Sequence, residues 1–136
     1  MTYLLDTNAC IRYLNGQSEA IMRRLQQLPP DEVAVCAVVK AELFYGAQRT
    51  RHPETTLANQ MVFLEPLRSF PFDDAAATQY GRIRATLAAQ GTPIGPNDLL
   101  IAAIALANQL TLVTHNVKEF SRIPDLLLED WEESAT

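Results

Sequence analysis

The segment Tyr3-Leu4-Leu5-Asp6-Thr7-Asn8 indicates the fold class of this chain. Three consecutive apolar residues that end in an acid are typical of a strand buried on both faces, because a half-exposed strand would alternate apolar and polar residues. The polar residues that follow can start a helix, and we expect Thr7 and Asn8 to cap one over residues 9–14. A buried strand that leads directly into a helix is typical of an α/β protein with a parallel sheet.

The same alternation continues along the chain. Apolar and β-branched runs predict further strands at residues 33–39, 69–72, 111–114 and 126–128. Apolar residues at helical spacing predict helices over residues 18–28, 53–67, 73–90 and 97–110, a helix through Glu42 to about Arg49, and a short turn over residues 117–120. We therefore predict one domain over residues 1–136, built as a three-layer α/β/α sandwich around a mostly parallel sheet.

Composition places the chain among ordinary globular proteins, because 48% of its 136 residues are hydrophobic and 20% are charged. The first residues carry no basic segment, and the longest apolar stretch, residues 99–107, is too short to cross a bilayer. We therefore expect neither a signal peptide nor a membrane span, and a cytoplasmic location. Cys10 and Cys36 lack metal-ligand spacing, and two reduced, buried thiols are favoured over a disulfide.

The net charge of -5 argues against a protein that binds nucleic acid by bulk electrostatics, since such domains are usually basic. Much of the excess is in the C-terminal residues Glu129, Asp130, Glu132 and Glu133, and without them the chain is near neutral. The charge therefore weakens a nucleic-acid function without excluding it.

Three acids lie near element ends, where parallel sheets bind their ligands. Asp6 directly follows the first strand, and neither Glu42 nor Asp98 has a charged residue three or four positions away along its helix. Helix capping would explain Asp6 or Asp98 alone, and a place at the edge of a buried stripe would explain Glu42 alone. Because an unpaired carboxylate is costly to bury, three such acids together favour a bound cation.

Oxygen ligands without a His or Cys pattern indicate Mg²⁺ or Mn²⁺ rather than zinc. Such an ion orients water and neutralises charge on a phosphate, so the acids predict hydrolysis of a phosphodiester, with Asp6, Glu42 and Asp98 as metal ligands. Asn116 follows the strand at residues 111–114 and is a further candidate at the same edge, where it would orient a water or a ligand. Glu119 is a candidate for a fourth acid.

The sequence gives weaker support for a functional role of several other polar and aromatic residues. His115 titrates in the range of acid–base catalysts, although a loop position is its only support. Arg49, Arg51 and His52 lie in a polar loop that could contact phosphates or simply face solvent. The ring of Tyr45 could stack on a base or pack against a protein partner.

Four segments together resemble the sequence blocks of PIN domains, and most of all those of VapC toxins. They are Leu4–Asn8, Ala41–Gly46, Pro93–Ala102 and Leu112–Phe120, and the ending Leu128–Trp131 is similar to the usual VapC C-terminus. The resemblance covers essentially the whole chain.

This resemblance implies a PIN-like fold and a Mg²⁺- or Mn²⁺-dependent endoribonuclease that serves as the toxin of a bacterial toxin–antitoxin pair. It also implies a homodimer and neutralisation by a VapB antitoxin. By position, Asp6 and Asp98 match the metal-binding aspartates of the family, Glu42 its third acid and Thr7 its small hydroxyl residue. Asn116 stands where many PIN domains carry a fourth acid. VapC proteins often have Asn there, so it stays open whether Glu119 supplies that charge and whether one metal or two bind.

The resemblance extends to a possible substrate. The block Pro93–Pro96 and the long helix at residues 73–90 are similar to the VapC branch associated with cleavage of initiator tRNA.

Two other functions fit the residues less well. A binding module would hold RNA, or act with an antitoxin on operator DNA, with little catalysis of its own, and the acidic charge and the absent fourth acid favour it. A small metal-dependent phosphatase would use the same acids on phosphomonoesters.

An apolar groove for a helix of the antitoxin is a further expectation. Its candidate residues are Ile11, Leu14, Phe44 and Tyr45, which could equally fill the core of the domain itself.

Overall fold

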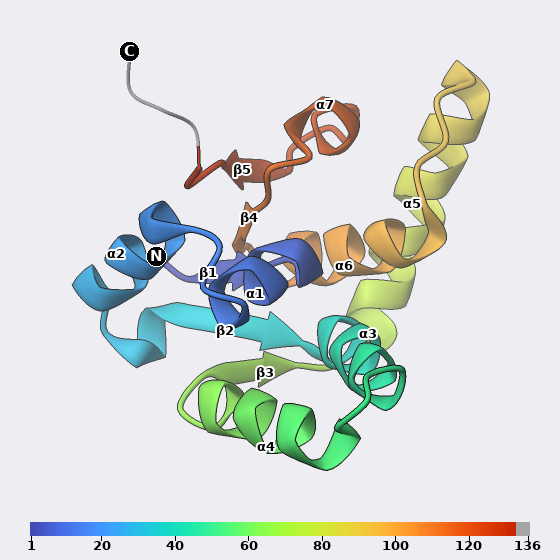
Figure 1. Cartoon of the computed structure of the whole chain (residues 1–136). Coiled ribbons are helices and arrows are strands. Elements are labelled where there is room, and N and C mark those ends of the chain that lie inside the picture. The colour runs from blue at the N-terminus through green and yellow to red at the C-terminus, as the bar shows by residue number, and fades with distance from the viewer. Residues whose placement is uncertain (133–136) are drawn as a thin grey trace.

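The computed structural model describes residues 1–132 and contains a five-stranded sheet in the order β3-β2-β1-β4-β5. Every pair of neighbouring strands is parallel. The strands are β1 (Tyr3–Leu5), β2 (Val33–Cys36), β3 (Arg68–Phe70), β4 (Thr111–Val113) and β5 (Leu127–Glu129). The predicted parallel α/β fold is confirmed (Figure 1).

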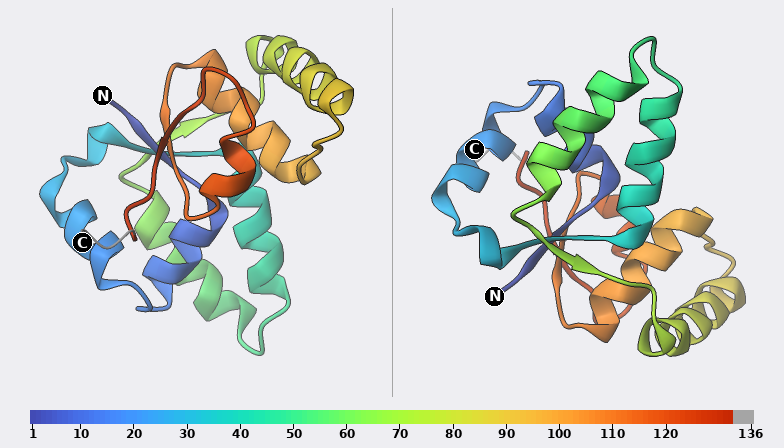
Figure 2. Two further views of the ribbon diagram at one scale, coloured as in Figure 1. Left: turned by 90° about the horizontal axis from the view of Figure 1, so that it is seen from above. Right: turned by 90° about the horizontal axis from the view of Figure 1, so that it is seen from below.

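Helices cover both faces of the sheet, as the two further views show (Figure 2). They are α1 (Thr7–Leu14), α2 (Glu19–Gln27), α3 (Ala37–Gln48), α4 (Pro53–Leu64), α5 (Asp74–Gln90), α6 (Pro96–Ala107) and α7 (Val117–Phe120), with a 3-10 turn, η1, over Pro30–Glu32. Right-handed crossovers put α1 to α4 on one face of the sheet and α5 to α7 on the other. The predicted three layers are therefore present, and one end of α5 extends beyond the sheet (Figure 1).

The strand order reverses between β1 and β4, since the chain first builds outward from β1 to β3 and then returns to add β4 and β5. At such a reversal the loops after the two strands leave in opposite directions and open a crevice at their carboxyl ends. Asp6 follows β1 and Thr114 follows β4 at this point.

Several predicted boundaries are wrong in detail, among them the end of α4, which is Leu64 instead of residue 67. Helix α1 begins at Thr7, and its N-cap is Asp6 rather than Thr7 or Asn8. Strand β2 ends at Cys36, because Val39 belongs to α3 and is fully buried there, so packing overrides the β-propensity of a branched side chain. Helix α6 ends at Ala107 instead of residue 110, and Gln109 turns the chain toward β4 with a left-handed φ of 55°.

The core lies between the sheet and the helix layers and includes all of β1, β2 and β4. Cys10 and Cys36 are buried free thiols in it, as predicted. None of the helices within residues 1–132 combines the length and the apolarity that a membrane span requires.

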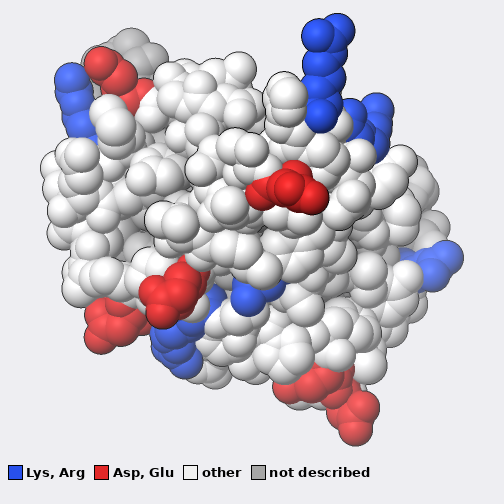
Figure 3. All heavy atoms as spheres, turned by 60° about the horizontal axis from the view of Figure 1, so that its bottom comes forward, with Lys and Arg blue, Asp and Glu red and all other residues white. Residues whose placement is uncertain are grey.

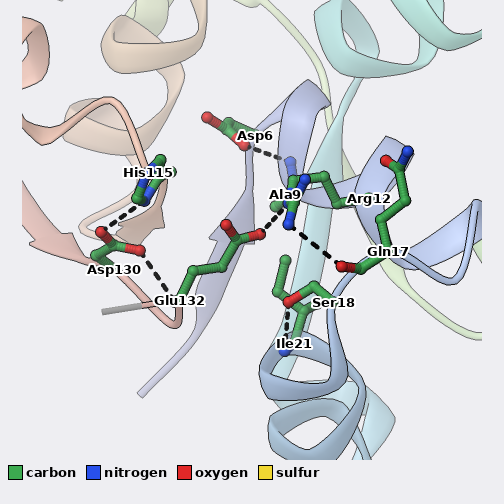
Figure 4. Close-up of polar contacts among 9 residues, drawn as sticks. All are labelled: Asp6, Ala9, Arg12, Gln17, Ser18, Ile21, His115, Asp130 and Glu132. Atoms are coloured by element: carbon green, nitrogen blue, oxygen red, sulfur yellow. Dashed lines mark hydrogen bonds and ion pairs between the residues drawn. The ribbon is translucent and has the colours of Figure 1, made fainter. Parts of the chain in front are cut away.

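The C-terminal acids do not form the free acidic tail that the sequence suggests. Glu132 pairs with Arg12 of α1, and Asp130 pairs with His115 at 2.9 Å (Figure 4). Glu129 pairs with Arg24 of α2 at 3.5 Å. We call these three acids the C-terminal cluster; Glu133 lies outside the described residues.

Aromatic packing holds the same segment against the body of the domain. The rings of Trp131 and Tyr3 meet edge to face at 5.5 Å, and the guanidinium of Arg24 lies 5.4 Å from the centre of each. The last described residues are therefore part of the folded unit, attached to β1 and to the helices on one face.

Candidate active site

Asp6 joins the candidate site to the sheet. Its backbone N–H donates to the carbonyl of Val113 at 3.1 Å, so it continues the pairing of β1 with β4. Its Oδ1 accepts from the N–H of Ala9 at 2.8 Å and caps α1 (Figure 4). The sequence left open whether Asp6 is a cap or a site residue. It is the cap, and Oδ1 alone accepts the capping bond, so capping does not occupy the other carboxyl oxygen.

The environment of Asp6 opposes its negative charge. It is 6% exposed, and burial raises the pKa of its carboxyl. The charges of Glu42 and Glu132 also raise this pKa, while hydrogen bonds from Thr114 and Ala9 lower it. The donors hold the carboxylate in place without supplying a positive charge.

Asp98 lies in the first turn of α6, but it does not cap the helix, since the N-cap is Gly95 and no side chain bonds there. The pKa of Asp98 is raised to about 6, mainly by burial and in addition by the charges of Asp6, Glu42 and Glu119. These acids come from the end of β1, from α3 and from α7. Four elements therefore direct carboxylates toward one region.

Glu42 is held by donors from two other helices. Thr7 Oγ1 of α1 donates to Glu42 Oε1 at 2.5 Å, and Asn97 Nδ2 of α6 donates to Glu42 Oε2 at 3.4 Å. A Glu at the edge of a buried stripe would not need these contacts. The side chain is instead oriented toward the region that Asp6 and Asp98 share.

Asn116 and Glu119 form one unit on the loop after β4. The backbone N–H of Asn116 donates to Thr114 Oγ1 at 3.0 Å, and its Nδ2 donates to Glu119 Oε2 at 3.1 Å. The amide thus orients a carboxylate whose charge reaches Asp98. The two residues, both candidates from the sequence, are therefore joined by a hydrogen bond.

No cation neutralises these four acids within residues 1–132. The ion pairs of that part of the chain involve neither Asp6, Glu42, Asp98 nor Glu119. The described residues also contain no group of three His, Cys, Asp or Glu side chains already at metal-binding spacing. The acids therefore share a region without forming a closed cage.

The donor set fits a hard divalent cation, because it is made of carboxylates with an adjacent amide and hydroxyls.

The weaker candidates lie outside this region. His115 is exposed and paired with Asp130 in the C-terminal cluster. Arg49, Arg51 and His52 are exposed, and the guanidinium of Arg49 lies 5.6 Å from the centre of the Tyr45 ring.

Two polar residues of the site were missed in the sequence. Thr114 was assigned only to a strand, and Asn97 only to a helix. Both lie near the end of an element, which is the property that identified the acids. Thr114 directly follows β4, and Asn97 lies beside Asp98 in the first turn of α6.

Comparisons with known proteins agree with this geometry. Residues 3–126 match the family model "PIN domain". A "Ribonuclease VapC2" from Rickettsia felis is 39% identical over 133 residues, with 97% of this chain and 99% of the relative covered. The chain belongs to the VapC branch of the PIN-domain family. A second VapC relative, a "tRNA(fMet)-specific endonuclease VapC" from Salmonella typhimurium, is 39% identical over 96% of this chain and 98% of its own length.

Solved VapC structures share the fold along the whole length. The VapBC2 complex from Rickettsia felis, bound to a DNA fragment from its promoter, has a TM-score of 0.91 and 39% identity, and covers 96% of this chain and 99% of its own. The DNA-bound VapBC complex from Salmonella typhimurium also has a TM-score of 0.91, with 38% identity over 96% of this chain and 98% of its own. The predictions of a PIN-like fold and of a VapC-type ribonuclease are confirmed at the level of the family.

Proposed function

We propose that this chain is a divalent-metal-dependent endoribonuclease toxin in which Asp6, Asp98 and Glu42 hold the cation. The observation that carries this proposal is the group of four carboxylates from four elements with no cation among them in residues 1–132. Mutual repulsion in a partly dehydrated place costs folding free energy, and a bound cation would relieve it.

Each acid has a different task in this proposal. Asp6 would bind through the oxygen that does not cap α1, so the helix fixes the direction of the ligand. Asp98 would bind from the first turn of α6, and Glu42 from a position set by Thr7 and Asn97. Asn116 would hold Glu119 as the fourth acid, which can orient a water or accept its proton. A bound Mg²⁺ or Mn²⁺ would neutralise charge on the phosphate and make water a better nucleophile at neutral pH.

We propose initiator tRNA as the substrate, because the Salmonella relative carries the name "tRNA(fMet)-specific endonuclease VapC" along nearly the full length of both chains. Tight loops and single-stranded regions are the parts of a tRNA that a protein of this size can recognise by sequence.

Purified protein should cleave initiator tRNA with Mg²⁺ or Mn²⁺ and stop when EDTA is added. Asp6→Asn is the sharpest variant, since Asn also caps helices while it lacks the charge for a cation. It should fold with an unchanged circular dichroism spectrum and lose cleavage. If Asp6→Asn cleaves as fast as the parent, Asp6 is only a helix cap.

We also propose a VapB-type antitoxin as partner, as in the solved VapBC complexes. A groove of about 370 Å³ lies between α1, α2 and α4. It is lined mainly by apolar residues: Tyr13, Leu14, Leu25, Leu28, Val62, Phe63 and Leu67. On the face that α4 and β3 turn outward, charged side chains are scattered among larger uncharged areas (Figure 3).

The groove contains only one of the four residues expected from the sequence, Leu14. Val62 is 78% exposed, which suits a position that a partner helix would cover. Val62→Glu should weaken capture of the antitoxin in a pull-down and leave cleavage unchanged. Met61→Glu, another exposed apolar position of α4 that does not line the groove, is the matched control.

A homodimer is the last part of the proposal. An apolar hollow beside Glu42, formed by Ala37, Val38, Ala41, Tyr45 and Leu100, offers a surface for a second copy. Tyr45 is 65% exposed there, and Tyr45→Glu should convert a dimer to a monomer in sedimentation. A monomeric parent would contradict this part.

A further inference from the structure

A second hollow, of about 320 Å³, lies between α5 and the start of α6. Its walls are mostly apolar and include Leu87, Ile94, Pro96 and Leu99. Two residues of α5, Tyr80 and Arg84, add an aromatic ring and a positive charge. None of the four acids of the candidate active site lines this hollow, so it is a separate feature.

Tyr80 and Arg84 are fixed relative to each other. Arg84 Nη1 donates to the Tyr80 hydroxyl at 2.8 Å, and its guanidinium carbon lies 5.8 Å from the ring centre. Phe72 meets the Tyr80 ring edge to face at 6.1 Å. Arg84 forms no ion pair with an acid of residues 1–132, so its charge is available to a ligand.

The hollow and the candidate active site share the first turn of α6. Pro96 and Leu99 line it, while Asp98 of the same turn belongs to the acids. Arg122 Nη1 donates to the carbonyl of Pro93 at 3.3 Å, which ties the wall of the hollow to the segment just after α7, the helix that carries Glu119. A nucleotide next to a phosphate bound at the acids would be within reach of the hollow.

We propose that this hollow binds one unpaired base of the RNA, from a nucleotide adjacent to the cleaved phosphodiester, with Tyr80 and Arg84 as residues that determine specificity. The inference deepens the proposed ribonuclease function and rests on it. Apolar walls and an aromatic ring accept the faces of a base, and a guanidinium can both stack on it and donate to its edge. The unpaired charge of Arg84 also complements the phosphates beside that base.

The test compares Arg84→Ala with Arg82→Ala in cleavage and binding of initiator tRNA. Arg82 is a matched control, since it lies on the same helix, is exposed, bonds within α5 to Gln79 and does not line this hollow. Arg84→Ala should raise KM about 10-fold, in keeping with the loss of one base contact, and change kcat little. Arg82→Ala should leave both within about twofold, as an exposed surface substitution does.

A substrate variant makes the assignment specific. After the cleaved bond is mapped, abasic sites are placed one at a time in the tRNA on either side of it. One abasic position should weaken binding to the parent as much as Arg84→Ala does, and should cost the Arg84→Ala protein nothing more. Additive losses, or equal effects of Arg84→Ala and Arg82→Ala, would overturn the proposal.

Two further outcomes separate the possible failures. If Arg84→Ala changes the sedimentation mass of the protein, the hollow is an interface between copies and the base site is wrong. Binding is measured in an Asp98→Asn background, where the RNA is not consumed. Tight binding by a parent that does not cleave would refute the nuclease proposal and, with it, a base site beside the cleaved bond. A parent that cleaves, with Arg84→Ala and Arg82→Ala alike, would overturn the base site alone.

Discussion

The molecule contains two groups of carboxylates with opposite surroundings. In the C-terminal cluster each acid has a nitrogen partner: Glu129 pairs with Arg24, Glu132 with Arg12, and Asp130 bonds to the His115 ring. At the carboxyl edge of β1 and β4 the acids meet hydroxyls, amides and one another. Two acids of the first group are paired with arginines, whereas within residues 1–132 no acid of the second group pairs with a cation.

This difference distinguishes acids that are paired within the fold from acids that we propose to bind a cation. A carboxylate with an internal cation gains from folding, since the pair forms only in the native state. Acids that raise one another's pKa repel each other in the native state, which lowers the free energy of unfolding. Groups with such shifted pKa values concentrate at functional sites. The comparison therefore predicts that changes in one group alter activity and changes in the other alter stability.

The largest expected effect is the loss of RNA cleavage when one of the four acids of the candidate active site is replaced. Asp98→Asn removes a charge at the centre of the repelling group and should lower kcat/KM for RNA at least about 100-fold, because the cation supplies several kcal/mol to the transition state. Single-turnover cleavage of tRNA measures this. Asp130→Asn, from the C-terminal cluster, is the control and should stay within about twofold of the parent. Equal losses in both would abolish the distinction.

The next prediction tests whether the hydrogen bond from Asn116 to Glu119 matters for metal binding. Asn116→Ala releases Glu119 and should weaken Mn²⁺ binding about 10-fold or more, as expected when a partner of a ligand is lost. Calorimetric titration with Mn²⁺ measures the affinity. Ser121→Ala is a control on the same segment, because its hydroxyl bonds only to the Lys118 carbonyl. Unchanged Mn²⁺ affinity in Asn116→Ala would remove Asn116 from the site.

Substitutions in the C-terminal cluster should lower the free energy of unfolding rather than the rate of RNA cleavage. Arg24→Ala removes the ion pair with Glu129 and the cation from between Tyr3 and Trp131, at a cost of about 1–2 kcal/mol of unfolding free energy. Arg23→Ala is the matched control, since its exposed pair with Glu19 contributes about 0.5 kcal/mol or less. Urea denaturation measures both, and each variant should cleave RNA at the parent's rate per folded molecule.

The smallest effect is on the pH dependence of the metal-free protein. The pKa of Asp98 rises from 3.8 to about 6 on folding, so the native state keeps a proton that the unfolded chain has released between these values. Unfolding free energy should therefore fall as pH rises through this interval and stay lower above it. The partial exposure of Asp98 makes the change small.

Thermal melts from pH 4 to pH 8 in EDTA measure this dependence. Asp98→Asn should make it shallower, and Mg²⁺ should raise the melting temperature more at pH 8 than at pH 5, because only the ionised acids attract the cation. A slope that does not change in Asp98→Asn would mean that other groups carry the pH dependence.

Much of the candidate site was predictable because its residues lie at the ends of predicted strands and helices, without a cation nearby in the sequence. Asp6 ends an apolar strand, and Glu42 and Asp98 lack local cations on their helices. The donors that orient Glu42 were not predictable, since Thr7 and Asn97 are 35 and 55 residues away from Glu42 along the chain. Contacts at such separations depend on how helices pack, which local patterns do not record.

The sequence by itself determined the strand–helix alternation, the parallel sheet and the acids at its carboxyl edge, because backbone periodicity and burial are local properties. Only the tertiary structure decided which acids are neutralised. In the sequence, Glu132 and Asp98 are both acids without a cation three or four residues away. In the fold, Arg12 reaches Glu132 from 120 residues away, while other carboxylates surround Asp98. The charge around a side chain is a sum over neighbours in space, and those neighbours come from every part of the chain.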